Sequence, residues 1–342
     1  MQDHSATLPV SLVQRLFAGL AHRPLVPEQL FKQAGIPDFL WQVSSGRITL
    51  TQFAQLYRLL VVTCDDETPG FFSRPLRCGT LKWLCLGLLD AATLKVALHR
   101  FIHFFHILQD DLQCEVVHEQ GLVWVRLVEV QALQGERVVV HELMLKLIHG
   151  IASWLIKEEI TPRQLACAYP RPHLHVDYLT FYPVSGVFDQ PFTGLAFDPH
   201  WLNKPVRQTR DQLTSFLHRA PQDWIQVPLG ERRLSAQVRE ELLRGQSLNA
   251  SVAEVADALY LSVRSLTRKL KFEGTGFQQI KDEVRRDWAV QQLVSTQTRL
   301  SVLAAHLGYE DLASFSRAFR RWTGSPPRAY RQGRRAFQSD PA

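Results

Sequence analysis

The sequence lacks any uninterrupted run of about 20 apolar residues, the length that a membrane-spanning helix needs. Its most apolar stretches, residues 81–89 and 101–108, are too short and contain Lys82, His103 and His106. The first residues also lack the basic segment followed by an apolar one that marks a secretory signal. These absences predict a cytoplasmic protein that does not enter a membrane.

Cysteine is scarce. The 342 residues contain five cysteines, an odd number, and no two of them form a CxxC pair. We therefore predict reduced, mostly buried thiols, as in a cytoplasmic protein, with a redox sensor as the alternative. The five are Cys64, Cys78, Cys85, Cys114 and Cys167.

Catalytic and metal-binding patterns are missing as well. No GxGxxG, P-loop, GxSxG or HExxH motif is present, and no pair of carboxylates stands out. His99, His103 and His106 share one face of a predicted helix, and His173 and His175 form an HxH, but no further ligand motif accompanies either set. We predict no metal, no cofactor and no enzyme.

Positive charge is present, and it is concentrated at one end. The net charge of the chain is +6, and residues 231–342 hold 19 Lys and Arg against 12 Asp and Glu, a balance of +7. The remaining two thirds of the chain are close to neutral. A small basic domain attached to a neutral larger one is suited to binding phosphate groups, although a basic surface alone could also be merely solvated.

The same basic third contains a helix-turn-helix pattern twice. The first copy is SVAEVADALYLSVRSLTRKLK at residues 251–271, and the second is LSVLAAHLGYEDLASFSRAFRRWTG at residues 300–324. Leu259 and Leu266 correspond to Leu307 and Phe315, so the copies are offset by 48 residues before the turn and by 49 after it. A generic helical bundle with surface arginines would not need two copies in register. The repeat predicts a protein that reads DNA with two helices.

Each copy has a second helix with an apolar inner side and a polar outer side. In residues 263–272, Ser262 is the expected N-cap, and Leu266 and Leu270 face the core. In residues 312–323, Asp311 is the expected N-cap, and Phe315 and Phe319 face inward. The residues expected to face DNA are Arg264, Thr267, Arg268 and Lys271 in the first copy, and Leu312, Ala313, Ser316, Arg317 and Arg320 in the second.

A single predicted helix, residues 277–295, joins the two copies. Its 19 residues span about 28 Å at the α-helical rise. That length approaches the roughly 34 Å that separates successive major-groove faces on one side of the duplex. The helix is therefore expected to fix the spacing of the two readers.

The rest of the chain predicts a mixed α and β structure. Helical spacing is seen at residues 10–21, 27–34, 50–64, 93–108 and 136–156, and a helix around 211–218 lies in a polar connection. Valine-rich stretches at 112–118 and 122–130 predict a β-hairpin, and 163–169, 186–188 and 194–197 predict strands. A short helix is expected at 175–181.

Residues 235–332 resemble the DNA-binding domain of AraC/XylS transcription regulators, through both repeats and the ending Pro327, Tyr330 and Arg331. The resemblance implies that the outward residues given above contact bases. This chain has Tyr260 where the family usually has Gly, which predicts strain or a shifted helix in the first turn.

The larger N-terminal part resembles, more loosely, the ornithine-utilisation-regulator (arabinose-binding-like) type within this family. The motifs are PGFFSRPLRCGTLKWLCLGLLDAATLKVALHRFIHFF and FYPVSGVFDQPFTGLAFDPHWLNKPV. This implies a module that senses a small-molecule effector and forms a homodimer. A hydrophobic or amphipathic effector is preferred, since polar clusters are scarce there. Four aromatic residues are candidates to line its pocket: Trp83, Phe104, Trp124 and Trp154.

These expectations combine into one architecture. A mixed α+β sensing and dimerisation domain (1–205) is followed by a linker (206–230), an all-α DNA-binding domain (231–333, with helix-turn-helix units at 252–273 and 300–323) and a tail (334–342). Its partners would be double-stranded promoter DNA, RNA polymerase and an effector, and family resemblance favours an activator. The alternatives are an alkyl-transfer enzyme with a reactive cysteine fused to the DNA-binding domain, and an N-terminal domain that only binds proteins.

Overall fold

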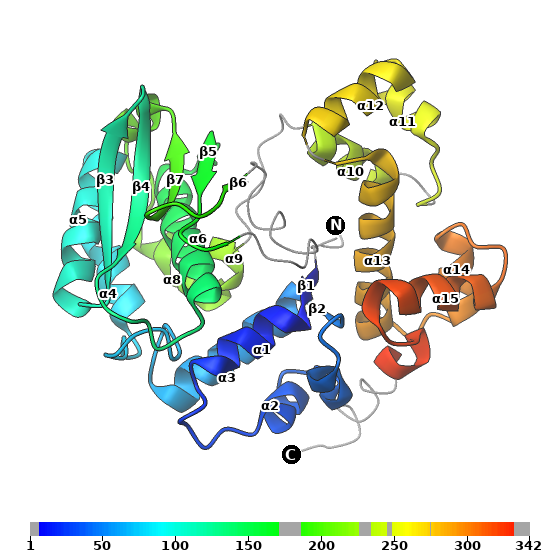
Figure 1. The fold of residues 1–342 in the computed structure, drawn as a ribbon, viewed down its shortest axis with the longest axis horizontal. Helices are drawn as coiled ribbons and strands as arrows, with labels where there is room; N and C mark the ends of the chain where they lie inside the picture. The colour runs from blue at the N-terminus through cyan, green and yellow to red at the C-terminus, as the bar shows by residue number, and fades with distance from the viewer. Residues whose placement is uncertain (1–6, 171–185, 226–233, 245–247, 274, 332–342) are drawn as a thin grey trace. The chain divides into compact units, whose positions relative to one another are not determined.

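The computed structural model describes residues 7–170, 186–225, 234–244, 248–273 and 275–331. Two compact units are present (Figure 1). The helical unit contains the described residues within 1–14, 26–56 and 230–342, and the sheet unit contains those within 15–25 and 57–229. The boundaries fall inside helix α1 (Val10–Ala18) and helix α3 (Leu50–Cys64), so each of these helices contributes to both units.

The sheet unit is built on a five-stranded sheet in the order β3-β4-β7-β5-β6. A hairpin starts it: β3 (Leu112–Glu119) pairs antiparallel with β4 (Leu122–Glu129), from Leu112 opposite Glu129 to Glu119 opposite Leu122. Gln120 and Gly121 form the two-residue turn, with φ values of 52° and 76°. Left-handed residues at both positions match the twist of the strands. The other strands are β7 (Thr193–Phe197), β5 (Gln164–Ala166) and β6 (Gly186–Val187).

Helices α5 and α6 pack along this sheet (Figure 1). Helix α6 (Arg137–Ile156) is buried nearly all round, and its first turn is capped by the Glu136 side chain, which accepts from Val139 N–H at 3.0 Å. It is the one described helix long and apolar enough to cross a membrane, but 89% of that stretch is buried inside the protein, as the core helix of a folded domain would be. The unit also contains α4 (Thr80–Leu88), α5 (Leu94–Leu108), η2 (Pro199–Asn203), α8 (Arg210–Arg219) and α9 (Gln222–Ile225).

In the helical unit, the long helix α13 (Phe277–Ser295) has α11 and α12 toward one end and α14 and α15 toward the other (Figure 1). A short antiparallel ribbon also packs on α13, and it consists of β1 (Thr7–Pro9) and β2 (Arg47–Thr49). The remaining elements are α2 (Pro27–Gln33), η1 (Asp38–Gln42), α10 (Leu234–Arg244), α11 (Val252–Ala258), α12 (Val263–Phe272), α14 (Leu300–His306) and α15 (Leu312–Thr323).

The structure confirms the predicted fold class, a mixed α and β part followed by a helical region with two helix-turn-helix units. The hairpin, α6 and α13 lie where the sequence predicts them, and the strand expected at 163–169 is shorter, at Gln164–Ala166. Helix α4 and the β1–β2 ribbon were not predicted. The helix expected at 175–181, with His173 and His175, lies outside the described residues.

The grouping into units differs from the predicted domain division in three places. The described residues within 1–14 group with the C-terminal helices. Residues 26–56 pack with the C-terminal helices, not with the sheet. The predicted linker contains α8, whose Leu213 and Phe216 are buried in the sheet unit. A buried apolar face explains why α8 is part of a folded unit, although the sequence around it is polar.

Candidate functional site

Local hydrogen bonds fix the first helix-turn-helix unit. Ser251 and Glu254 form a reciprocal capping box at the start of α11, with Glu254 N–H donating to Ser251 Oγ at 3.2 Å. Ser262 caps α12 as predicted, since its Oγ accepts from Ser265 N–H at 3.2 Å. Leu266 and Leu270 are both fully buried. These contacts turn one fixed face of α12 outward.

That outer face of α12 is cationic. Arg264, Thr267, Arg268 and Lys271 are all exposed. Within the described part of the chain, none of the three cations on this face has a carboxylate within ion-pair distance. The face can therefore bind phosphate or base edges without first breaking an internal ion pair.

The first turn contains Tyr260 in a left-handed conformation, with φ of 55°. Its N–H donates to Asp257 O at 2.9 Å, and its side chain is 97% exposed. In the second unit, the corresponding residue is Gly308, with φ of 79°. Tyr260 therefore keeps the turn geometry that the family builds with glycine, and no shift of the first helix is needed.

The second unit repeats this arrangement. Asp311 Oδ1 accepts from Ser314 N–H at 2.7 Å, so Asp311 is the predicted N-cap of α15. Phe315 and Phe319 are fully buried, while Arg317 is exposed and donates from Nη2 to Ser314 Oγ at 2.9 Å. Among the other residues expected to face DNA, Ala313 and Arg320 are exposed. Leu312 and Ser316 are half-buried.

Helix α13 holds the two helix-turn-helix units together through the segment before α11, residues 248–250. Lys281 Nζ donates to the carbonyls of Asn249 and Ala250 at 3.0 and 2.8 Å, and Arg285 Nε donates to Leu248 O at 3.0 Å. Burial lowers the pKa of the Lys281 ammonium and of the Arg285 guanidinium. The backbone carbonyls that accept from them replace part of the lost hydration.

The same segment reaches the second unit, because Leu248 N–H donates to His306 O at 3.3 Å. A Cβ on Gly308 would lie 2.6 Å from Asn249 Oδ1. The spacing of the two readers is therefore set by direct contact as well as by the length of α13. Nothing in the local sequence pattern singles out Lys281, Arg285 or Asn249 for this role.

A buried polar network docks the β1–β2 ribbon on α13. Thr7 Oγ1 donates to Asp287 Oδ1 at 2.5 Å, and Arg47 Nε donates to Thr7 Oγ1 at 2.9 Å. Arg47 N–H donates to the hydroxyl of Tyr330 at 2.8 Å. Burial opposes ionisation of Asp287, but Arg286, Arg47 and Arg239 hold the pKa of its carboxyl below the ordinary value. The ribbon is thus part of the frame that supports both readers.

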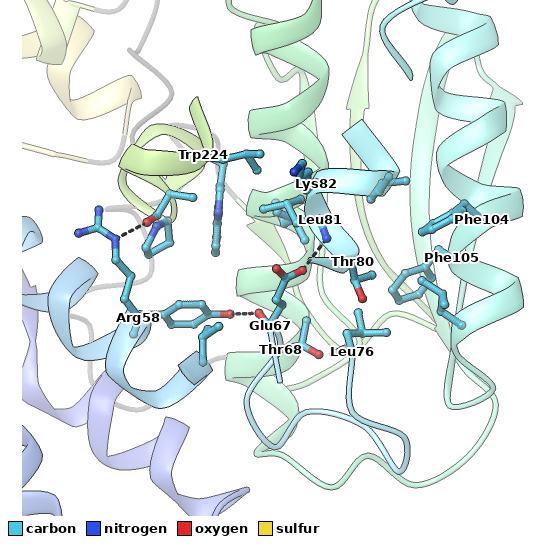
Figure 2. A pocket seen from close by; sticks show the side chains of 18 of the residues that line it. Arg58, Glu67, Thr68, Leu76, Thr80, Leu81, Lys82, Phe104, Phe105 and Trp224 are labelled. Carbon is cyan, nitrogen blue, oxygen red and sulfur yellow. Dashed lines mark hydrogen bonds between the residues drawn. The ribbon is translucent and has the colours of Figure 1, made fainter. Parts of the chain in front are cut away.

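The sheet unit contains a cavity of about 430 Å³ (Figure 2). This volume is within the range of small-molecule sites. Its walls come from α3, α4, α5, α6 and the α8–α9 segment and are mostly apolar, including Tyr57, Phe101, Phe104, Phe105 and Trp224. Glu67 also lines it, accepting from Gly79 and Leu81 N–H at 2.9 and 2.5 Å, and burial raises the pKa of its carboxyl.

The cavity contains one of the four aromatic residues expected to bind an effector, Phe104. Trp83 is 68% exposed on α4, Trp124 packs against Ala166 and Ala196 in the sheet, and Trp154 stacks on Phe216 at 4.5 Å. Trp224 also lines the cavity. It was not predicted to do so, because it lies in the polar segment expected to be a linker.

Four of the five thiols lack the environment of a nucleophile. Cys78 is exposed and the other four are buried. Burial raises the pKa of Cys85 and Cys114 to about 12, and it also raises the pKa of Cys64 and Cys78. A reactive cysteine needs a lowered pKa, so neither the redox sensor nor the alkyl-transfer alternative gains support from these four thiols.

The predicted histidine face on α5 is a surface feature. His99 and His103 are exposed, and His106 Nε2 accepts from Cys114 N–H at 3.2 Å. Across the described ranges, no three His, Cys, Asp or Glu side chains group closely enough to hold a metal ion.

Comparisons with known proteins agree with this architecture. Residues 25–206 match the N-terminal arabinose-binding domain of AraC transcription regulators, and residues 255–333 match a helix-turn-helix domain. The ornithine utilization regulator of Pseudomonas aeruginosa is 27% identical over 326 residues, which cover 95% of this chain and 96% of that protein.

Two further proteins show more limited similarity. The regulator VirS of Mycobacterium tuberculosis is 30% identical over 150 residues, 42% of each chain. The crystal structure of the transcriptional regulator CdpR from Pseudomonas aeruginosa is 20% identical, covers 94% of this chain and 98% of its own, and superposes with a TM-score of 0.31. The first family model alone covers more than half of the sequence. The chain belongs to the AraC family of transcription regulators.

Proposed function

We propose that this regulator binds two adjacent major-groove segments of one promoter with α12 and α15, and that an effector in the sheet unit controls this binding. One observation carries the proposal: two helices with exposed cationic residues are held on one frame by α13 and by the segment before α11. Arg264, Thr267, Arg268 and Lys271 would serve the first segment. Leu312, Ala313, Ser316, Arg317 and Arg320 would serve the second.

Helix α3 supports control by an effector. Its first half, residues 50–56, belongs to the helical unit, and its second half, residues 57–64, belongs to the sheet unit. Tyr57, Arg58 and Val61 in the second half line the cavity. A ligand that reorders these residues acts on a helix that continues directly into the unit with the DNA readers. A homodimer that activates transcription with RNA polymerase in the cytoplasm completes the proposal.

Salt dependence of DNA binding tests the proposal. DNA fragments selected by the purified protein from its source genome would be titrated at several salt concentrations. Lys271→Ala should weaken binding about equally on all sequences and reduce the slope of log affinity against log salt by about 1. The matched control is Lys269→Ala, which lies on the other side of α12 and should keep the slope. An unchanged slope in Lys271→Ala contradicts the assigned face.

A further inference from the structure

We propose that the cavity of the sheet unit binds a molecule with an apolar body and one anionic group, which is attracted to a cavity edge that carries Lys82, Arg58 and His218. This inference rests on the proposed function, because it assigns the effector's chemical class. Two features of the cavity carry it, namely the composition of its walls and the balance of charge around it.

The walls require an apolar body. Aromatic rings contribute from three separate elements, with Tyr57 on α3, Phe101, Phe104 and Phe105 on α5, and Trp224 on α9. Aliphatic side chains such as Leu84 and Leu147 complete the surface. The Tyr57 hydroxyl already has a partner within the protein, since it donates to Glu67 O at 2.9 Å. A ligand binds to apolar walls of this kind mainly because its apolar surface is removed from water.

The edge of the cavity favours a negative group. Arg58, Lys82 and His218 come from α3, α4 and α8, and all three are exposed. Arg58 Nε donates to Ala220 O at 2.8 Å, which fixes the guanidinium beside the α8–α9 segment (Figure 2). In the described part of the chain, neither Lys82 nor Arg58 forms an ion pair with a carboxylate.

One acid, Glu67, is among the described lining residues, and it offsets only part of this charge. Glu67 directs its carboxylate to the backbone N–H groups of Gly79 and Leu81, at the start of α4. Its two oxygens are therefore already hydrogen-bonded within the protein, while the two cations remain available. With two cations against this one carboxylate, the described lining carries a positive balance of charge, which favours a ligand anion over a ligand cation.

The same chemistry argues against two polar ligands. Arabinose carries a hydroxyl on nearly every carbon, and the aromatic walls offer few partners for buried hydroxyls. Ornithine has a carboxylate that this edge could attract, but it also has two ammonium groups on a short chain, and the mostly apolar walls offer them Glu67 as the acid among the described lining residues. The family model and the relative's name therefore do not decide the effector of this chain.

Isothermal titration of the full-length protein tests the inference with defined compounds. Dodecanoate, dodecylamine and dodecanol share an aliphatic body, and 2-naphthoate and 2-naphthylmethanol share an aromatic one. At least one carboxylate should bind more tightly than its own alcohol, and dodecanoate should bind more tightly than the amine. The preferred body shows whether the natural ligand is aliphatic or aromatic.

Variants locate the binding site. Lys82→Gln should weaken carboxylate binding by about threefold or more, the scale of a partly exposed ion pair, and leave alcohol binding unchanged. Lys95→Gln, at an exposed lysine of α5 outside the cavity, is the matched control. Val61→Trp should fill the cavity and abolish binding of every compound, while Val96→Trp on the surface of α5 should not.

Several outcomes would overturn the inference. These are equal binding of amine and carboxylate, no binding of either carboxylate, wild-type affinity in Val61→Trp, or tighter binding of ornithine or arabinose. DNA binding would be measured on the same samples. If the wild-type protein binds DNA but none of these compounds, only the assigned ligand class is contradicted, whereas a wild-type protein that does not bind DNA contradicts the proposed function.

Discussion

Tyr260 and Gly308 occupy the same position in the two turns, yet their surroundings differ. Tyr260 adopts φ of 55° with its side chain in solvent, while Gly308 adopts φ of 79° with Asn249 packed against it. A left-handed conformation costs a residue with a Cβ roughly 1–2 kcal/mol, and glycine avoids this cost. Part of that gain in stability is lost, because glycine also makes the unfolded state more flexible. The two positions should therefore respond differently to substitution.

We predict that Tyr260→Gly raises the free energy of unfolding by roughly 0.5–1 kcal/mol without changing DNA affinity. Gly308→Ala should lower it by roughly 2–4 kcal/mol, because strain and overlap with Asn249 add. Urea unfolding of the purified variants measures both. Destabilisation by Tyr260→Gly, or neutrality of Gly308→Ala, would contradict the strain assigned to Tyr260 or the overlap assigned to Gly308.

Two histidines of α6 are buried in neutral form. Burial lowers the pKa of His141 to about 4 and that of His149 to about 3. His141 Nδ1 lies 2.6 Å from Thr193 Oγ1, and His149 donates from Nε2 to Ile160 O at 2.8 Å. In the unfolded chain both protonate near pH 6.5, so below that pH the unfolded state binds more protons.

The sheet unit should therefore lose stability as the pH falls from 6.5 toward 4. At pH 5.5 the loss is expected to be about 1.4 kcal/mol per histidine relative to neutral pH. Urea unfolding at pH 7.5 and 5.5 checks this, and His149→Gln should show a smaller difference between the two pH values. The exposed His118→Gln serves as the control. An equal pH dependence in wild type and His149→Gln is the contrary result.

The inward and outward sides of the reading helices could be predicted residue by residue. Leu266, Leu270, Phe315 and Phe319 follow the helical period, and Ser262 is a residue type that caps helices. The cavity could not be predicted in this way. Its aromatic walls come from helices far apart in the sequence, and nothing in the local pattern separates Phe104, which lines it, from Trp154, which stacks on Phe216.

Among the elements, the β1–β2 ribbon has the clearest structural role that the sequence did not reveal. Its strands have three residues each and pair across about 40 positions, so they give no periodic signal. Helix α4 was not predicted, because its own leucines lie on several of its faces and give no clear helical period. By contrast, α13 and the hairpin are long enough for their period to identify them.

We predict that the ribbon stabilises α13 through Arg47 and Asp287. Arg47→Met should cost about 3–5 kcal/mol, because it leaves the buried Asp287 with fewer counter-charges. The double variant Arg47→Met, Asp287→Leu should cost clearly less than the sum of the single changes, by about 1–3 kcal/mol. Hydrogen exchange of α13 amides and urea unfolding measure the effect.

An exposed pair provides the control for this cycle. Arg100 pairs with Asp90 on the surface of the sheet unit, and Arg100→Met should cost less than about 1 kcal/mol. Additive losses in the Arg47 and Asp287 variants would mean that the two residues do not interact through the network.

For the whole molecule, the concentration of charge at one end and the two repeats were enough to predict a DNA-binding regulator. The grouping of residues 26–56 with the C-terminal helices was not predictable, because it depends on contacts between distant parts of the chain. Single-residue changes in α12 and α15 should therefore act on separate parts of the operator, while changes in the shared frame should act on both.

Selection of binding sites from random DNA, read by sequencing, tests the central claim of two readers most directly. Wild type should select two conserved segments about one helical turn apart. Arg268→Ala should relax base preference at one position in one segment, and Arg317→Ala at one position in the other, each losing about 1–3 kcal/mol. Unchanged preferences in both variants, or relaxation of both in the same segment, would contradict the account.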